Sequence, residues 1–344
     1  MAKKKLFIQI PCFNEEKTLP SVIADLPDSI EGIDEIYTLV IDDGSTDKTV
    51  AVAKEIGVDF IVQNHRNLGL AKSFSKGIEA CLYLGADIIV NTDGDNQYCG
   101  ADIPELVKPL LMNRTDIVVG CRNITSHKEF SWLKKSLQLL GSKVVRLLSK
   151  TDVPDVTSGF RAISKEAGIR CYYMNGFSYT VEMLIQAGRT NLTIDSVPIR
   201  TNPKTRESRL FKSMPDFILK QLQIMITLYI FYRPFKLFGI LSAISMGVSI
   251  LLSSRIFYHL WFLNSELAKF KTGTGILLMV TAVVTILFLI AGVLASVLSG
   301  LRFLAIDIRS RIREIEINLN HKPLNCKIIT AKKMFQWQKT RLKT

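Results

Sequence analysis

Cysteine is scarce in this sequence and follows no recognisable pattern. The six cysteines of the 344-residue chain include no CxxC pair, and their spacing does not form the framework of a small disulfide-stabilised domain. This excludes a secreted disulfide scaffold and a cysteine-rich zinc module. We expect reduced, mostly buried cysteines in a cytoplasmic domain.

Charged residues are absent from two long stretches, Leu237–Ser254 and Thr272–Leu301. The first has about the minimum length of a membrane-spanning helix and the second exceeds it. A buried core helix is the alternative, and it fits the first stretch better than the second. We expect no N-terminal signal peptide, because Met1–Lys5 leads directly into a short apolar segment that reads as a strand. Two spans would then leave both chain ends, and the large region before the spans, in the cytoplasm.

The net charge of +13 is unevenly distributed. Residues 1–203 carry 23 basic and 25 acidic side chains, whereas residues 204–236 carry 7 and 2 and residues 302–344 carry 11 and 3. The basic excess therefore flanks the apolar stretches, which is typical of the cytoplasmic side of a membrane. Nucleic-acid binding would require a basic recognition face on the folded part, so we expect no nucleic-acid partner. The basic residues of the connecting loop, such as Lys269 and Lys271, weaken the topology prediction.

Three short apolar segments each lead into an acidic turn. The segments Leu6–Ile10, Tyr37–Ile41 and Ala86–Asn91 precede turns that begin at Pro11, Asp42 and Thr92. Helix-start signals follow the first two turns, so the pattern predicts strands that alternate with helices in a parallel sheet. The turns should then meet at one sheet edge, where open α/β sheets bind ligands.

The turn after the third segment contains Asp93, Asp95 and Gln97. Carboxylate and amide oxygens are ligands that suit Mg²⁺ or Mn²⁺, which can in turn bind phosphates. A plain polar turn is an equally good interpretation of this motif when it is considered alone.

Four motifs in order along the chain carry a family resemblance. They are Pro11-Cys12-Phe13-Asn14-Glu15, Asp42-Asp43-Gly44-Ser45, Asp93-Gly94-Asp95 with Gln97, and Asp155-Val156-Thr157-Ser158-Gly159-Phe160-Arg161. Together they resemble the family 2 glycosyltransferases of GT-A fold, and among these the polyprenyl-phosphate glycosyltransferases that include dolichol-phosphate mannose synthases. The resemblance covers roughly residues 5–210 and extends to the apolar stretches.

The resemblance implies an α/β architecture with a Rossmann-like, mostly parallel sheet. We expect a cytoplasmic catalytic domain at 1–212 and an interfacial helix at 213–233. A two-helix transmembrane region at 234–301 should follow, with spans near 235–258 and 274–301. The remainder, 302–344, would be a basic cytoplasmic tail, either flexible or bound to the membrane surface.

The resemblance also implies site residues for a nucleotide-sugar donor. A Mg²⁺ or Mn²⁺ ion held by Asp93, Asp95 and Gln97 would neutralise the diphosphate leaving group, with Asp95 nearest the metal. Asp42 and Glu15 would contact the base and ribose. The complete expected donor-binding set is Pro11, Phe13, Asn14, Glu15, Asp42, Asp43, Asp93, Gly94, Arg206 and Arg209. The last two lie in a segment that closes on the donor phosphates in relatives, although the Gly-x-Ser-Lys form found there is absent.

A polyprenyl phosphate is the acceptor that the resemblance implies. Arg122 and the Lys134–Lys135 pair are the candidates to hold its phosphate, although a solvated helix face explains the lysine pair equally well. Asp155 is counted with Asp95 and Arg122 as catalytic, either orienting the sugar or assisting as a base, with a purely structural turn as the alternative. Glu182 could present a carboxylate to the sugar, or lie on a helix surface.

The sequence thus predicts an inverting glycosyltransferase that moves one sugar from a UDP- or GDP-sugar to a polyprenyl phosphate at the membrane. Transfer to another lipid such as diacylglycerol, and an inactive membrane scaffold, are the alternatives. Neither the sugar nor the nucleotide can be read from the chain. Small residues in the second span, such as Gly292 and Gly300, would permit a homo-oligomer through the transmembrane helices.

Overall fold

The structure is a computed structural model that divides the chain into two compact units, residues 1–218 with 306–344 and residues 219–305. It describes residues 3–122, 145–146, 151–171, 179–203, 219, 223, 226–227, 229–262, 272–319 and 327–330. The expected Lys134, Lys135, Arg206 and Arg209, and most of the expected interfacial helix, lie outside these residues. Those positions of 213–232 that are described are helical.

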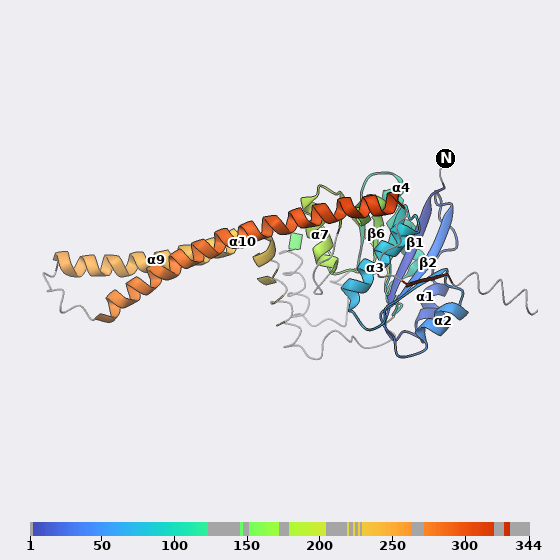
Figure 1. Ribbon diagram of the computed structural model, residues 1–344, viewed down its shortest axis with the longest axis horizontal. Helices are drawn as coiled ribbons and strands as arrows, with labels where there is room; N and C mark the ends of the chain where they lie inside the picture. The colour runs from blue at the N-terminus through green and yellow to red at the C-terminus, as the bar shows by residue number, and fades with distance from the viewer. Residues whose placement is uncertain are drawn as a thin grey trace, which may run out of the picture. The chain divides into compact units, whose positions relative to one another are not determined.

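Within the described residues, eight strands of the first unit form one sheet in the order β7-β5-β6-β4-β1-β2-β3-β8. Figure 1 labels β1, β2 and β6 of this sheet. The strands are β1 (Lys5–Cys12), β2 (Glu35–Asp42), β3 (Phe60–Gln63), β4 (Ile88–Asn91), β5 (Ile117–Cys121), β6 (Arg161–Ser164), β7 (Ile194–Pro198) and β8 (Lys327–Thr330). Strands β1 to β4 are mutually parallel, and β5 is parallel to β7. Antiparallel β6 joins these two groups. The prediction of a mostly parallel sheet is therefore confirmed.

Helices alternate with the strands, as the sequence pattern predicts. They are α1 (Leu19–Ala24), α2 (Thr49–Glu55), α3 (Leu70–Tyr83), α4 (Ile103–Leu111, preceded by the short η1, Gly100–Asp102), α6 (Lys165–Arg170) and α7 (Tyr179–Arg189).

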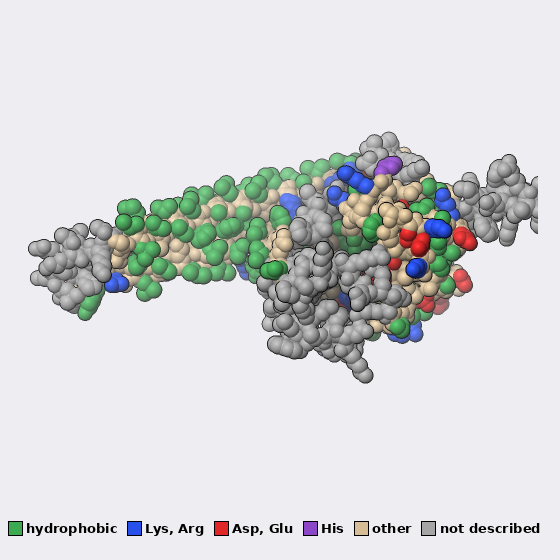
Figure 2. Space-filling view, turned by 90° about the horizontal axis from the view of Figure 1, so that it is seen from below, with side chains coloured by type: hydrophobic (Ala, Val, Ile, Leu, Met, Phe, Trp, Pro, Cys, Tyr) green, Lys and Arg blue, Asp and Glu red, His purple; other side chains and the backbone are tan. Residues whose placement is uncertain are grey.

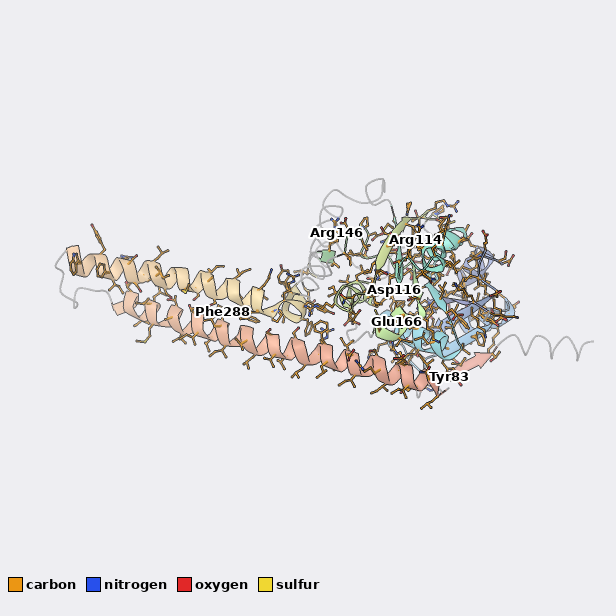
Figure 3. The ribbon with its side chains drawn as sticks, turned by 90° about the horizontal axis from the view of Figure 1, so that it is seen from above. Tyr83, Arg114, Asp116, Arg146, Glu166 and Phe288 are labelled. Carbon is orange, nitrogen blue, oxygen red and sulfur yellow. The ribbon has the colours of Figure 1, made fainter. Side chains whose placement is uncertain are left out.

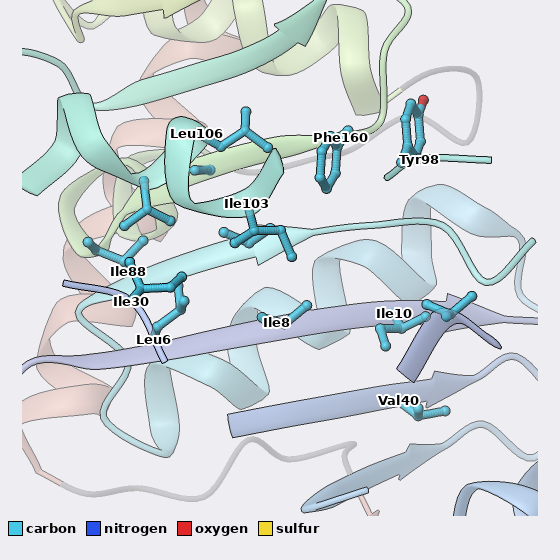
Figure 4. Close-up of a cluster of buried hydrophobic side chains, with 14 of the residues drawn as sticks. Leu6, Ile8, Ile10, Ile30, Val40, Ile88, Tyr98, Ile103, Leu106 and Phe160 are labelled. Atoms are coloured by element: carbon cyan, nitrogen blue, oxygen red, sulfur yellow. The ribbon is translucent and has the colours of Figure 1, made fainter. Parts of the chain in front are cut away.

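Alternate side chains of β1 point to opposite faces of the sheet. Leu6, Ile8 and Ile10 pack with Ile103 and Leu106 of α4 in a fully buried cluster (Figure 4). Phe7, on the other face, packs against the rings of Tyr37 and Phe60. This two-sided burial explains why β1 is apolar almost throughout.

The predicted basic tail differs from the structure in two places. The helix α10 runs from Thr272 to Asn318, beyond the expected end at 301, and β8 adds an antiparallel strand to β3. The alternation of charge and apolar residues in Asp307–Asn318 continues a helical pattern, and Ile328 and Ile329 supply apolar side chains for an edge strand. Charge counting alone missed both.

Arg313 anchors the last turns of α10 within the first unit. Its side chain is 4% exposed, and its guanidinium donates to the carbonyls of Gly168 (2.8 Å) and Cys171 (3.0 Å) and to Glu79 on α3 (3.0 Å). The last turns of α10, from Ile306 onward, are therefore part of the folded first unit.

The second unit contains α9 (Pro234–Phe262) and the first part of α10. Only 6% of the most apolar window of each helix is buried, which argues against core helices of a soluble protein. Hydrophobic side chains cover both helices along their length (Figure 2). Between the helices, Ser245 donates to the carbonyl of Thr281 at 3.0 Å, and Phe288, labelled in Figure 3, packs on Phe238. Both helices are long and apolar enough to cross a membrane.

Candidate active site

The carboxyl ends of β1, β2 and β4 lie side by side. Cys12 pairs with Asp42, and Gln9 pairs with Asn91, so the turn after β1 is flanked by the turns after β2 and β4. The expectation that the three acidic turns meet at one edge is confirmed by this register. Several carboxylates surround the end of β1. Burial, and then the charges of Glu15, Asp42 and Asp93, raise the pKa of the Cys12 thiol well above its usual value. Such a field favours a bound cation.

The turns after β1 and β2 are tied to each other. Asn14, in the left-handed region at φ 57°, donates its backbone N–H to Ser45 Oγ at 2.9 Å and accepts from the Thr46 N–H at 2.8 Å. The Glu15 N–H donates to Thr49 Oγ1 at 2.9 Å. The side-chain oxygen of Asn14 is thus used to shape the site. Pro11 is buried in β1, and Phe13, which follows, is half-buried.

Asp42 and Asp43 are adjacent, yet their surroundings differ. Asp42 is fully buried; its Oδ1 accepts from the Ser45 N–H at 3.0 Å, while Oδ2 has no hydrogen-bond partner among the described residues. Asp43 instead accepts from Asn64 and from the backbone N–H groups of Leu68 and Gly69, each at 2.9 Å. Asp42 therefore keeps an acceptor for a ligand, whereas Asp43 fixes the loop that opens α3.

The turn after β4 packs tightly against β1. A Cβ on Gly94 would lie 3.0 Å from Cys12 Sγ and 3.2 Å from the Pro11 carbonyl oxygen, so a side chain there would require these neighbours to shift. Thr18 Oγ1 lies 2.7 Å from the Gly94 carbonyl oxygen and 2.8 Å from Glu15 Oε2, and its one hydroxyl hydrogen can be donated to either. Glu15 is buried, and Thr18 lies between it and the turn that carries Asp93 and Asp95.

The side chains of Asp93, Asp95 and Gln97 are all half-buried, and the Gln97 N–H donates to Asp95 Oδ1 at 3.2 Å. In the described part of the chain, no three His, Cys, Asp or Glu side chains gather as a closed metal cage. Two carboxylates are nevertheless a sufficient protein contribution for Mg²⁺ or Mn²⁺, because such ions take their other ligands from water and substrate phosphates. The oxygen atoms of Asp93, Asp95 and Gln97 are therefore suitable ligands for a divalent ion that also binds a diphosphate.

Arg122 and Asp155 form a buried ion pair beside this turn. Arg122 Nε and Nη2 donate to the two carboxylate oxygens of Asp155 at 2.7 and 3.2 Å, and the side chains are 22% and 1% exposed. Burial raises the pKa of Asp155, but the hydrogen bond and charge of Arg122 outweigh it, so the net pKa is lowered. Arg122 Nη1 makes no hydrogen bond to any described residue and stays available for an anion.

Aromatic rings complete the wall next to this pair. The Arg122 guanidinium lies 5.9 Å from the centre of the Tyr98 ring, which stacks on Phe160 at 5.0 Å (Figure 4). Burial raises the pKa of Tyr98, so its hydroxyl stays protonated at neutral pH. Tyr98 was not among the residues that the sequence singled out, although its position directly after Gln97 was a usable signal.

Arg161 and Glu182 are also buried. Arg161 is 1% exposed and donates to the carbonyls of Val156, Ser158 and Thr180, so it holds the Asp155–Arg161 turn against α7. Glu182 is buried at 3% exposure, which contradicts the alternative of a helix-surface glutamate.

The chain after β7 returns to the same edge. Asn202 N–H donates to the Gln97 carbonyl at 2.9 Å, and Arg200 binds Asp102 through both its backbone N–H (2.6 Å) and its guanidinium. The guanidinium of Arg200 is thus engaged with Asp102. Residues 199–203 run beside the Gln97–Tyr98 turn, immediately before the segment that carries Arg206 and Arg209.

The mostly parallel sheet and its acidic edge are those of a GT-A fold, and comparisons with known proteins give the family. Residues 7–170 match the model of glycosyl transferase family 2. The chain is 32% identical over 223 residues to UDP-N-acetylglucosamine--dolichyl-phosphate N-acetylglucosaminyltransferase of Methanococcus voltae, a match that covers 58% of this chain and 87% of that protein. It is 26% identical to undecaprenyl-phosphate mannosyltransferase of Micrococcus luteus, over 55% of this chain and 80% of that protein.

A solved structure agrees with the fold. Glucosyl-3-phosphoglycerate synthase from Mycobacterium tuberculosis, in complex with Mn²⁺, UDP and phosphoglyceric acid, is similar with a TM-score of 0.52 and 20% identity. The match covers 66% of this chain and 78% of that chain. The chain belongs to glycosyl transferase family 2, and it is a glycosyltransferase with two candidate membrane spans.

Proposed function

We propose that the protein transfers one sugar from a UDP- or GDP-sugar to a polyprenyl phosphate, with inversion, at the cytoplasmic face of a membrane. The observation that carries the donor part is the edge formed by β1, β2 and β4, where the unpaired Asp42 Oδ2 and the Asp93–Gln97 turn flank the end of β1. The lipid acceptor is supported by the two membrane-lipid sugar transferases to which the chain is similar.

The donor site divides into a base side and a diphosphate side. On the base side, Asp42 Oδ2 would accept an N–H of the nucleotide base, since a buried acceptor without a partner is otherwise costly. On the other side, Asp93, Asp95 and Gln97 would hold Mg²⁺ or Mn²⁺, which would supply charge neutralisation for the departing diphosphate. Arg206 and Arg209 would reach the same phosphates from the segment that follows Pro203.

Arg122 is the proposed contact for the acceptor phosphate. Asp155 accepts from Nε and Nη2, and Nη1 has no partner among the described residues, so Asp155 would orient the arginine rather than serve as a base. A phosphate oxygen is already anionic near neutral pH, so placement and charge compensation suffice for its attack on the sugar. Lys134 and Lys135 remain candidates for the same phosphate.

We also propose the expected arrangement in the membrane. The catalytic unit and both chain ends would be cytoplasmic, with α9 and α10 as the spans. This arrangement is supported by residues 306–319 and by β8, which belong to the same unit as the sheet.

The test uses the purified full-length protein in detergent with radiolabelled UDP- and GDP-sugars, Mn²⁺, and either undecaprenyl phosphate or diacylglycerol. We expect labelled product with the polyprenyl phosphate, and transfer to diacylglycerol alone would refute the acceptor. Asp95→Asn should lower turnover by about two to three orders of magnitude, since single charge-stabilising groups commonly contribute that much. Glu105→Gln, an exposed carboxylate of α4, is the matched control and should retain activity.

Arg122→Lys tests the acceptor contact separately. It keeps a positive charge near Asp155 but removes the planar fork of the guanidinium. We expect kcat/KM for the lipid to fall about tenfold to a hundredfold while nucleotide affinity is retained. Equal losses of nucleotide binding and transfer would assign Arg122 to the donor site.

A further inference from the structure

Two amide side chains lie inside the otherwise apolar centre of the sheet. Gln9 of β1 and Asn91 of β4 are neighbours in the register and are 0% and 2% exposed. Gln9 Nε2 donates to Asn91 Oδ1 at 2.9 Å, but Gln9 Oε1 has no hydrogen-bond partner among the described residues. A buried acceptor without a partner costs free energy, so an apolar pair would serve stability better.

The amide nitrogen of Asn91 reaches the turn between Asp155 and Arg161. Asn91 Nδ2 donates to the Gly159 carbonyl at 2.8 Å and to the Tyr179 hydroxyl at 3.4 Å. From the other side, the Gly159 N–H donates to the Tyr98 hydroxyl at 3.1 Å. Both backbone groups of Gly159 are therefore fixed by buried side chains.

Gly159 in turn lies against the carboxylate of Asp93. A Cβ on Gly159 would lie 2.8 Å from the Tyr179 hydroxyl and 3.2 and 3.4 Å from the two carboxylate oxygens of Asp93. The Tyr179 ring is held by stacking on Phe74 of α3, with ring centres 4.1 Å apart. Asp93 thus rests on a wall whose position depends on Asn91 and Tyr98.

We propose that Asn91 is a positioning residue for the transfer reaction: it holds Gly159 and Tyr179 so that the Asp93 carboxylate faces the diphosphate side of the donor site. The inference rests on the proposed function, because Asp93 is a proposed metal ligand. Asn91 itself would touch neither donor nor metal. Groups of this outer kind typically change metal affinity about tenfold to a hundredfold when they are replaced.

The test measures nucleotide binding by calorimetry, with UDP and with GDP, in the presence and absence of Mn²⁺. The readout is the dissociation constant without Mn²⁺ divided by the dissociation constant with Mn²⁺. This ratio measures how much the metal strengthens nucleotide binding, separately from the base side. Asn91→Asp has nearly the same shape but replaces by an oxygen the amide nitrogen that donates to the Gly159 carbonyl. We expect this ratio to fall about tenfold relative to the wild type, with metal-free binding unchanged.

Two further variants keep the test decisive. Tyr98→Phe keeps the ring stacked on Phe160 and removes only the acceptor of the Gly159 N–H, so a smaller fall in the same ratio is expected even where Asn91→Asp does not fold. Asp59→Asn is the matched control, because Asp59 is a buried polar residue that accepts from Thr38, in the middle of β2 and four residues before Asp42. It should lower the melting temperature without changing the ratio.

The inference is overturned if Asn91→Asp and Tyr98→Phe leave the ratio at the wild-type value, or lower it no more than Asp59→Asn does. Failure of the proposed function has a different signature, since it is seen in the wild type. There, Mn²⁺ would fail to strengthen the binding of either nucleotide, and the inference would fall with it.

Discussion

Replacing Arg122 by alanine should destabilise the catalytic unit because it leaves a buried carboxylate without its cation. Asp155 has a 1% exposed side chain, and apart from Arg122 it accepts a side-chain bond only from Thr157, at 2.9 Å, among the described residues. Breaking a buried ion pair by removing one partner commonly costs about 3–5 kcal/mol. Since the Arg122 side chain is 22% exposed, we expect about 3 kcal/mol, near the lower end.

The pH dependence of this loss has a definite sign. In the wild type the pKa of Asp155 is lowered, so the pair contributes stability above the ordinary aspartate pKa of about 4 and loses it as the pH falls further. In Arg122→Ala the burial of Asp155 is no longer opposed, so its pKa should rise above that of the unfolded chain. The variant is then penalised most at neutral pH, and the gap to the wild type should narrow toward pH 4.

Urea unfolding of the full-length protein in detergent, followed by tryptophan fluorescence between pH 4 and 8, measures this gap. The double variant Arg122→Ala/Asp155→Asn should recover part of the loss, because a neutral amide costs less to bury than an unpaired carboxylate. Arg170→Ala removes an exposed pair with Glu166 and serves as the control, with an expected loss below about 0.5 kcal/mol. A gap that is independent of pH, or a double variant as unstable as the sum of the single ones, would refute the reasoning.

Three other variants test separate parts of the molecule. Asp42→Asn should weaken UDP or GDP binding about tenfold or more in calorimetry without loss of thermal stability, because Oδ2 has no described partner to lose; unchanged affinity would exclude Asp42 from the base site. Gly159→Ala should lower kcat about a hundredfold, since the added methyl group would displace Tyr179 or Asp93, and normal turnover would contradict the wall described above. Arg313→Met should lower stability by about 3 kcal/mol in thermal unfolding. The nearby exposed Arg311→Met should change it by less than about 0.5 kcal/mol, and equal effects would show that Arg313 is not an anchor.

The strands of the donor site were predictable because local sequence determines them. Leu6–Ile10, Tyr37–Ile41 and Ala86–Asn91 are largely apolar runs that end in turn residues. The structure extends the first two by one or two residues at each end and begins the third at Ile88. The joint position of the acidic turns followed from parallel pairing alone. Short apolar segments buried on both faces leave little freedom in this part of the fold.

The contacts between side chains that are far apart in the sequence could not be predicted in the same way. Arg122 and Asp155 are 33 residues apart, and Asn91 and Gly159 are 68 apart, so each pair depends on how β4, β5 and β6 are ordered in the sheet. The strand β8 was missed for a related reason. Lys327–Thr330 has a strand-like composition, but only the exposed edge of β3 gives it a partner.

Asp42 and Asp43, at the end of β2, show why a sequence motif locates a site but does not tell which of its residues bind a ligand. Asp42 and Asp43 would be interchangeable in a motif, yet successive side chains at a strand end point to opposite faces of the sheet. On one face, Asp43 accepts hydrogen bonds from Asn64 and from the loop before α3. On the other, Asp42 Oδ2 has no partner among the described residues. The same logic applies to Arg122, whose Nη1 stays available because Asp155 holds the other nitrogens in place. In this protein, side chains whose polar atoms are all hydrogen-bonded internally, such as Asp155, fix the position of neighbouring side chains that still have a polar atom available for a ligand.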